Sequence, residues 1–405
     1  MNVNEKTIEI LKDNYICDRC LGRQGAQLLS GLTNEERGQI LRKHLAMIID
    51  SGEKIKVNES NFYGIKFHNS KIKPNKPKKC SICGDIFPEL KKKAKLIVKA
   101  LSKYEFNTFL IGCLPTPELL EKEEKLWEKV GVEWCEPIRS EINRILGKEV
   151  ESLTGKVMER KTPDITAVYD LNTDTVELTI RSIFIYGKYQ KLVRNMPQTT
   201  WKTRIYPFSV QDIIAKPFMK QTKAEAHRLH GAGREDVDVR CLGWRPFVLE
   251  LINPKKRKVT TTKPCFQINK SKKAKVKDLK LANKQTVTKV KSIKPDKTYK
   301  AEITFEKPLE NLEKINSLND IIINQQTPTR VLKRRVDKLR KRKVKDIKYK
   351  TLNKKKLEIT VTTQAGTYIK ELIHGDEGRT QPNISDLINN KVKSIKLDVI
   401  KIHCD

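Results

Sequence analysis

The sequence predicts an α+β protein with two domains, the first mixing helices with one strand and the second built mainly from β-strands. Two observations lead to this prediction. The chain has 405 residues, and at roughly 100–200 residues per domain this length suggests two domains or three. The spacing of apolar residues also changes near residue 160, from helical periodicity to strict alternation. We therefore expect domains at 1–158 and 159–405.

The first domain has four segments with the apolar spacing of helices and one with that of a buried strand. The first helix begins at Thr33, because Thr33 and Glu36 have the spacing of a capping box. A basic amphipathic helix follows, then a strand rich in apolar residues, and then two further helices. In chain order these five segments are 33–50, 88–104, 107–114, 117–130 and 136–155.

Strand patterns dominate from residue 163 onward. In the segment 175–181, Val176, Leu178 and Ile180 alternate with polar residues, which predicts a half-buried strand. An antiparallel or mixed sheet is the expectation for this second domain. Its most basic stretch, at about 254–300, reads as an insert.

Four of the nine cysteines form two C-x-x-C pairs, Cys17 with Cys20 and Cys80 with Cys83. Two such pairs supply the four thiolates of a tetrahedral structural zinc, which is the interpretation we favour. Unliganded reduced thiols or a redox dithiol are the alternatives. A secreted disulfide framework is not expected, since the cysteine count is odd and no signal peptide is visible.

The charge of the chain predicts a polyanionic partner. The 83 Lys and Arg residues exceed the 49 Asp and Glu residues by 34, and neutralising phosphates releases counterions and drives binding. Two stretches, 254–300 and 330–345, are the most basic and could track phosphates, although a solvated surface is the plainer interpretation. No stretch is apolar enough to span a bilayer. A cytoplasmic, nucleic-acid-binding protein is therefore expected.

A short acidic turn offers a candidate catalytic residue. Asp236 and Asp238 follow a glycine-containing bend and lie between Arg234 and Arg240, where guanidinium groups would hold a carboxylate ionised. The residues alone favour an ordinary Asx turn with surface salt bridges over a catalytic role. No GxGxxG or GxxxxGK[ST] motif occurs, so no organic cofactor is expected.

Four segments resemble the archaeal and eukaryotic tRNA pseudouridine synthases of the Pus-ten family. They are IFIYGKYQKLVRNMPQTTW, GREDVDVR with RPFVLEL, NQQTPTRVLKRRVDKLRKRKVK, and TQAGTYIKELIHGDEGRTQPNISDLI, found at 183–201, 233–251, 324–345 and 363–388. The chain departs from the family pattern after Arg240, where the segment up to Phe247 is one residue shorter and has Trp244. This departure puts the turn beyond Asp236 in doubt.

The resemblance implies an isomerase with a pseudouridine synthase fold and an N-terminal zinc-bearing, THUMP-like domain. Its substrate would be tRNA, modified at positions 54 and 55 of the T-arm and gripped at the acceptor end, and the enzyme would be a monomer. Asp236 corresponds to the family nucleophile and Arg234 to the arginine of its Arg-x-Asp element. The other substrate contacts that the resemblance implies are Tyr299, Tyr368, Ile369, Lys370 and Leu397, with Lys370 pairing with Asp236; Asp238 would be structural.

Two other classes of protein compete with this interpretation. A non-catalytic zinc-containing RNA-binding protein or chaperone would explain the charge and the cysteines, but not the ordered Asp, Tyr and Lys motifs. An RNA methyltransferase with a THUMP-like module would need a glycine-rich cofactor loop, which the sequence lacks.

Overall fold

The computed structural model describes residues 1–201, 203 and 205–404 and divides into two compact units, Met1–Arg181 and Ser182–Asp405. The division falls later than the boundary expected at 158/159. The reason is that strand β3 (Ile165–Asp170) pairs in parallel with β1 (Thr108–Leu114), and β4 (Thr175–Ile180) pairs with β3. The first strands after residue 158 thus complete the sheet of the first unit.

The first unit is a four-stranded sheet with helices, in the strand order β2-β1-β3-β4. The capping box expected at Thr33 and Glu36 begins α3, and α4 and α6 pack against the sheet, with Leu146 and Ile97 fully buried. Besides β1, β3 and β4, the elements are α1 (Val3–Leu11), α2 (Asp18–Gly22), α3 (Asn34–Asp50), α4 (Ile86–Leu101), α5 (Pro117–Val130), α6 (Ile138–Thr154) and β2 (Val157–Met158).

The second unit is a ten-stranded mixed sheet with the order β13-β10-β11-β12-β9-β14-β7-β5-β8, and with β6 paired to β7. The pair β14 and β7 is parallel, with Asp398 opposite Arg240, and the other pairs of this sheet are antiparallel. Its strands are β5 (Ile183–Lys191), β6 (Ala226–Gly231), β7 (Arg240–Ile252), β8 (Ala274–Ala282), β9 (Lys297–Phe305), β10 (Ile321–Gln325), β11 (Arg340–Asn353), β12 (Lys356–Thr363), β13 (Thr380–Gln381) and β14 (Val392–Ile402).

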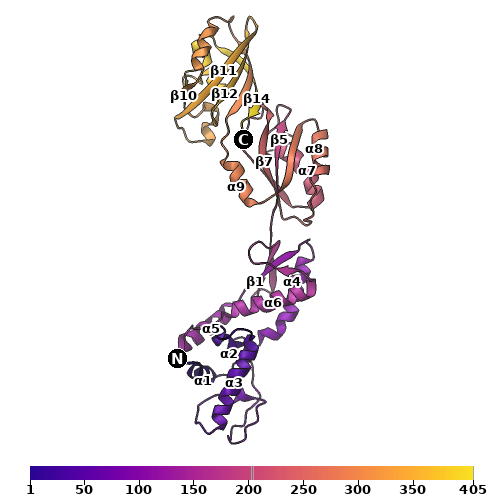
Figure 1. Cartoon of the computed structure of the whole chain (residues 1–405), viewed down its shortest axis with the longest axis vertical. Coiled ribbons are helices and arrows are strands. Elements are labelled where there is room, and N and C mark those ends of the chain that lie inside the picture. Colours follow the sequence, from indigo (N-terminus) through magenta and orange to yellow (C-terminus); the bar gives the residue numbers. More distant parts are fainter. Residues whose placement is uncertain (202, 204, 405) are drawn as a thin grey trace. The chain divides into compact units, whose positions relative to one another are not determined.

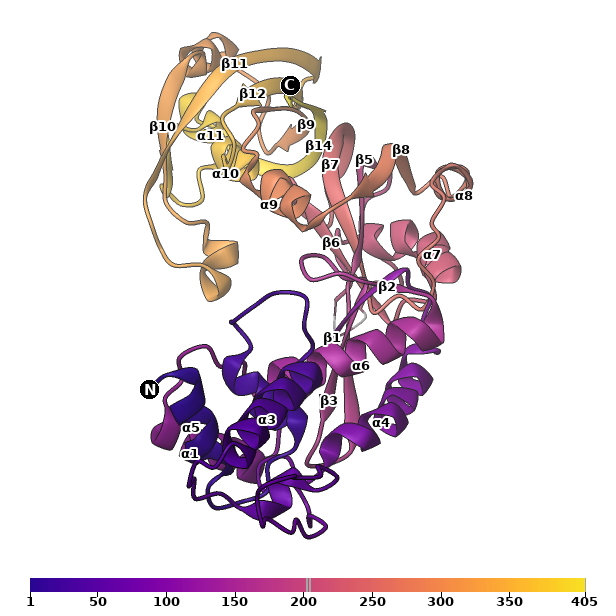
Figure 2. The same ribbon diagram turned by 60° about the horizontal axis from the view of Figure 1, so that its bottom comes forward.

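Helices cover the two ends of this sheet differently. At one end α7 (Val210–Thr222) and α8 (Thr262–Lys270) pack on one face of β5, β7 and β8, while α9 (Lys284–Ser292) packs on the other (Figure 1). At the other end α10 (Ile369–His374) and α11 (Ile384–Leu387) pack against the strongly curved strands β9, β12 and β14 (Figure 2). Short 3-10 helices lie at Arg23–Gly25, Glu59–Phe62, Leu312–Leu318 and Thr329–Arg334.

Two expectations about the second unit change with the structure. The basic stretch 254–300 is not an appendage, because it forms α8, the edge strand β8, α9 and the beginning of β9. Lysines on an edge strand discourage pairing with another chain. Trp244 lies within β7 and not in a turn; its neighbour Gly243 faces β14, where a Cβ would be only 3.0 Å from backbone atoms of Lys401 and Ile402.

None of the helices in the described part of the chain combines the length and the apolar character needed to cross a bilayer.

Candidate active site

A cavity of about 320 Å³ in the second unit brings together residues from five separate parts of the chain. They come from β7 with the loop before it, from β9, from the 3-10 helix Thr329–Arg334 with Arg335 after it, from α10 with the loop before it, and from β14. All seven residues expected to form the site line this cavity. They are Arg234, Asp236, Tyr299, Tyr368, Ile369, Lys370 and Leu397.

The loop that carries Asp236 is held in place by the buried residue before it. The Glu235 side chain is inaccessible to solvent, and its Oε2 lies 3.1 Å from Nε of the equally buried Arg245. Tyr189 donates its hydroxyl to the same carboxylate, at 3.2 Å. Since an unpaired charge would be very costly at this depth, the pair fixes the loop in one position.

A buried lysine fixes the loop from its other side. Lys191 Nζ donates to the carbonyl oxygens of Asp236 (3.0 Å) and Val237 (3.1 Å). Burial lowers the pKa of Lys191, although the nearby carboxylates oppose this shift. With the backbone held on both sides, the Asp236 side chain projects into the cavity and remains 40% exposed.

Two cations face the Asp236 carboxylate. Arg330 Nη1 lies 3.0 Å from Asp236 Oδ2, and Arg330 Nε lies 2.7 Å from Oε1 of Glu371, which is buried. Burial disfavours the charge of Arg330, but hydrogen bonding and attraction to Glu371 and Asp236 outweigh burial and raise its pKa. Arg330 is therefore a permanent cation that bridges two carboxylates.

Lys370 is the second cation, and its position differs in part from the expected pairing. Its Nζ is 3.7 Å from Asp236 Oδ2, but it donates to both carboxylate oxygens of Asp238, at 2.8 and 2.9 Å. Burial raises the pKa of Asp238, and the hydrogen bond and attraction of Lys370 lower it by more, so the net shift is downward. Lys370 thus links the two aspartates and hydrogen-bonds to only one.

Strand β9 contributes an aromatic ring and a buried ammonium group. Burial raises the pKa of Tyr299 to about 12, despite the opposing charge of Arg245, so its hydroxyl stays protonated. Lys297 is only 8% exposed; burial, with Arg245 nearby, lowers its pKa to about 8. Its Nζ donates to the carbonyl of Pro295 at 3.1 Å.

Tyr368 is positioned by a buried amide. Gln325 Nε2 donates to the carbonyl of Tyr368, and the N–H of Tyr368 donates to Gln325 Oε1, both at 2.9 Å. Arg335 Nη1 donates to the Tyr368 hydroxyl, also at 2.9 Å. The two tyrosines, with the apolar side chains of Ile369 and Leu397, give the cavity surfaces suited to a flat ring.

Sequence reasoning missed four positively charged residues of this cavity. Arg330 and Arg335 belong to the basic stretch 330–345, where nothing distinguishes them from their neighbours. Lys297 precedes Tyr299 by two residues, so that both point to the same side of β9, and this spacing was the one available signal. Nothing in the sequence around Arg245 indicates that its side chain is buried beside a glutamate.

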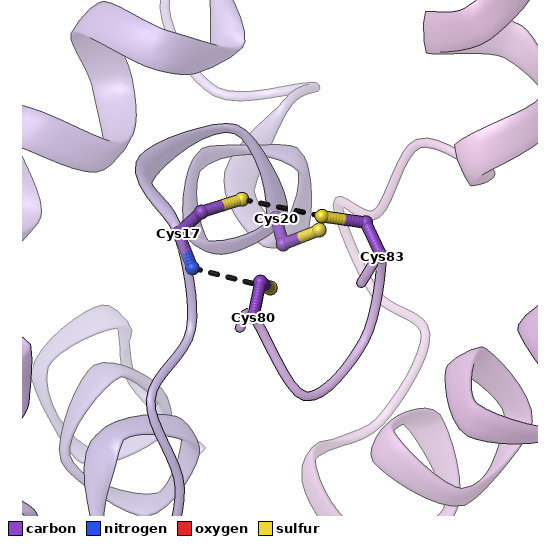
Figure 3. Close-up of side chains that lie close together, drawn as sticks. All are labelled: Cys17, Cys20, Cys80 and Cys83. Carbon is purple, nitrogen blue, oxygen red and sulfur yellow. Dashed lines mark hydrogen bonds between the residues drawn. The ribbon is translucent and has the colours of Figure 1, made fainter. Parts of the chain in front are cut away.

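The four paired cysteines meet in the first unit. Cys17 and Cys20 lie at the start of α2, and Cys80 and Cys83 in the turn before α4 (Figure 3). Their sulfur atoms all lie within 4.8 Å of one another, with Cys17 Sγ and Cys83 Sγ 3.6 Å apart. In a tetrahedron with metal–sulfur bonds of about 2.3 Å the sulfurs are roughly 3.8 Å apart. The cluster therefore has the dimensions of a four-thiolate metal site, and the N–H of Cys17 donates to Cys80 Sγ at 3.3 Å.

Comparison with known families and proteins gives consistent matches. Residues 184–403 match the family model described as Pus10, C-terminal, and residues 94–170 match the archaeal Pus10 THUMP domain. The chain is 37% identical to tRNA pseudouridine synthase Pus10 of Thermofilum pendens, over 98% of this chain and 95% of that protein. It is 36% identical to the protein of the same name from Pyrococcus furiosus, over 98% and 97% of the two chains. Among solved structures, a Cbf5-Nop10-Gar1 complex matches 52% of this chain and 47% of its own, with 17% identity and a TM-score of 0.30.

Proposed function

The chain belongs to the Pus10 family of tRNA pseudouridine synthases, and we propose that it isomerises uridines 54 and 55 in the T-arm of tRNA with Asp236 as the nucleophile. The activity of the family is an isomerisation, in which a uridine of tRNA becomes pseudouridine. The observation that carries the assignment of Asp236 is its place in the cavity. Its half-exposed carboxylate is contacted by Arg330 and approached by Lys370, in a cavity that two tyrosines also line.

The substrate uridine must leave its stack before it can react. Extruding a base costs a few kcal/mol, which stacking and phosphate contacts offset. Tyr299 would stack on the extruded uracil, while Ile369 and Leu397 would contact its other surfaces. Tyr368, oriented by Gln325, would close the cavity near the ribose.

The reaction moves the ribose from nitrogen to carbon of the same base. The Asp236 carboxylate attacks the ribose C1′ or the base, the C1′–N1 bond breaks, and the detached uracil rotates in the cavity. A C1′–C5 bond then forms, C5 loses its proton, N1 gains one, and the carboxylate is released. Atoms and charge balance without a redox partner, so the proposal includes no organic cofactor.

Two cations lie beside the proposed nucleophile. Arg330 is 3.0 Å and Lys370 3.7 Å from Asp236 Oδ2, where they would orient the attacking carboxylate. The protonated Tyr299 hydroxyl can carry or relay a proton near C5. Arg234, at the rim, would contact a backbone phosphate beside the extruded nucleotide.

The first unit would bind RNA and hold the metal. Residues 94–170, which match a THUMP domain, would grip the acceptor end of tRNA, with the enzyme acting as a monomer in the cytoplasm. Cys17, Cys20, Cys80 and Cys83 would hold a structural zinc. Bound zinc would crosslink α2 to the turn before α4, and no reaction step passes through it.

The test is direct. Purified protein is incubated with an unmodified tRNA transcript, and pseudouridines are mapped by carbodiimide treatment and primer extension. We expect stops at positions 54 and 55, absent with the Asp236→Ala variant. Pseudouridine outside the T-arm would contradict the assigned positions, and tight tRNA binding without any pseudouridine would point to the non-catalytic alternative.

A further inference from the structure

A second and larger cavity lies in the same unit, between α7 and α8. It encloses about 650 Å³ and shares no lining residue with the candidate active site. We call it the α7–α8 groove and define it by its apolar floor, Phe208, Ile213, Pro217 and Ile268, and its basic rim, Lys216, Lys220 and Lys273. Its volume falls in the range of small-ligand sites.

The floor of the groove is an apolar surface. Phe208, Ile213 and Pro217 are half-buried, so their apolar atoms can still be reached from the groove. Pro217, which lies inside α7, adds the apolar surface of its ring to the floor. A flat ring could lie against this floor.

The rim is positively charged, and Asp212 is the one acid among the described residues that line the groove. Lys216 and Lys220 are exposed and lie one turn apart on α7, and Lys273 Nζ sits 3.5 Å from the centre of the Phe208 ring. The carboxylate that lines the groove, Asp212, is already used to cap α7, because Ser209 and Thr200 hydrogen-bond to it. Three lysines against one carboxylate leave the groove with a net positive charge that suits an anion.

We propose that the α7–α8 groove holds one nucleotide of the substrate tRNA that does not react. The base would stack on Phe208 in the place over the ring that Lys273 Nζ now takes, and Lys273 would turn with Lys216 and Lys220 to the adjoining phosphates. An aromatic ring beside a row of cations is how proteins hold single-stranded nucleotides. The proposal rests on tRNA being the substrate, and it explains why Lys273, in the basic stretch 254–300, covers an aromatic ring.

The first experiment compares variants by kinetics and salt dependence. Lys216→Gln with Lys220→Gln should raise KM for tRNA and flatten the salt dependence of binding by about 1.4–1.8 slope units, since two phosphate contacts are lost. Phe208→Ala should raise KM between about 5- and 150-fold, and Phe208→Tyr should restore it. Lys348→Gln with Lys350→Gln, two exposed lysines on β11, is the charge-matched control and should change neither quantity.

The second experiment locates the RNA on the protein. A tRNA transcript containing 4-thiouridine is irradiated with the Asp236→Ala protein, and crosslinked peptides are identified by mass spectrometry. Crosslinks within 208–220 or 267–273 support the proposal, and their absence together with an unchanged KM and salt slope in the double lysine variant overturns it. A groove that binds an acidic peptide and not RNA would give this same negative result. This result does not depend on which residue is the nucleophile. Isomerisation by Asp236→Ala would refute the role of Asp236 as nucleophile, while the crosslinks and salt slopes would still test whether the groove binds RNA.

Discussion

Arg330 and Asp236 lie far apart in the sequence, yet Nη1 of Arg330 is 3.0 Å from Oδ2 of Asp236, closer than the 3.7 Å that separates Lys370 from the same oxygen. Nε of the same guanidinium lies 2.7 Å from Oε1 of the buried Glu371. The charge expected to stabilise the carboxylate of Asp236 therefore comes mainly from a residue of the basic segment 330–345. This segment has a role in the site besides any contact with phosphates.

The first prediction separates the two aspartates. Asp236→Ala and Asp236→Glu should both lower pseudouridine formation by several orders of magnitude, since the first removes the carboxylate and the second displaces it by about a methylene. Affinity for tRNA, measured by filter binding, should stay close to that of the unchanged protein. Asp238→Ala should retain measurable turnover, because Asp238 contacts Lys370 and does not line the cavity. Loss of activity in Asp238→Ala with activity kept in Asp236→Ala would show that the nucleophile is misassigned.

The second prediction concerns the bridge made by Arg330. Arg330→Met should destabilise the second unit by roughly 1–3 kcal/mol, because the buried Glu371 carboxylate loses its partner, and it should also slow turnover. Adding Glu371→Leu should restore the free energy of unfolding but not kcat, since an apolar pair packs without supplying a cation to Asp236. Urea denaturation and single-turnover kinetics measure the two effects. Recovery of kcat in the double variant would mean that Arg330 serves stability alone.

The site residues with family motifs were predictable from the sequence, and the residues that support them were not. Asp236 and Lys370 lie in the family segments 233–251 and 363–388, and the structure places them in one cavity with Tyr299. Their supporting contacts depend on three-dimensional neighbours. Nothing in the local sequence indicates that Glu235 is buried against Arg245, or that Lys370 donates to Asp238.

The fold class was predictable because each segment of clear periodicity became the expected element. The helices expected at 117–130 and 136–155 are α5 and α6, and the strand at 107–114 is β1. The domain boundary was harder to place. Alternation of apolar residues shows that β3 and β4 are strands, but it does not show which sheet they join, and their partner β1 lies earlier in the chain.

The third prediction tests the hydroxyl of Tyr299. Tyr299→Phe keeps the ring that would stack on uracil and removes the group that would handle a proton, so kcat should fall by roughly 10- to 100-fold at unchanged affinity for tRNA. Tyr368→Phe is the matched control, since its hydroxyl contacts Arg335 at the exposed side of the cavity. A larger effect on KM than on kcat in Tyr299→Phe would contradict a role in proton transfer.

The fourth prediction concerns the metal. Purified protein should contain about one zinc per chain, and replacing any one of Cys17, Cys20, Cys80 or Cys83 by Ser should lower that content. Chelation should destabilise the first unit before the second, because the four cysteines belong only to the first. Elemental analysis and hydrogen exchange measure the two effects, with Cys265→Ser, a cysteine of the second unit, as the control. Metal-free protein whose four thiols all react freely with a thiol reagent would contradict the zinc site.

The last prediction follows from the buried ammonium group of Lys297, whose pKa is lowered to about 8 by burial and by the like charge of Arg245, with Asp296, Cys241 and Cys404 opposing this shift. Below pH 8 the lysine is charged in the folded and the unfolded chain alike, so folding must bury that charge. Between about pH 8 and 10.4 only the unfolded chain binds the proton, and the free energy of unfolding should therefore rise with pH, by on the order of 3 kcal/mol in total. Lys297→Met has no proton to lose and should lack this rise. Urea denaturation of both proteins across the pH range measures the difference. Groups that titrate equally in both proteins cancel in this comparison. Parallel pH profiles for the two proteins would show that burial does not lower the pKa of Lys297 in the folded state.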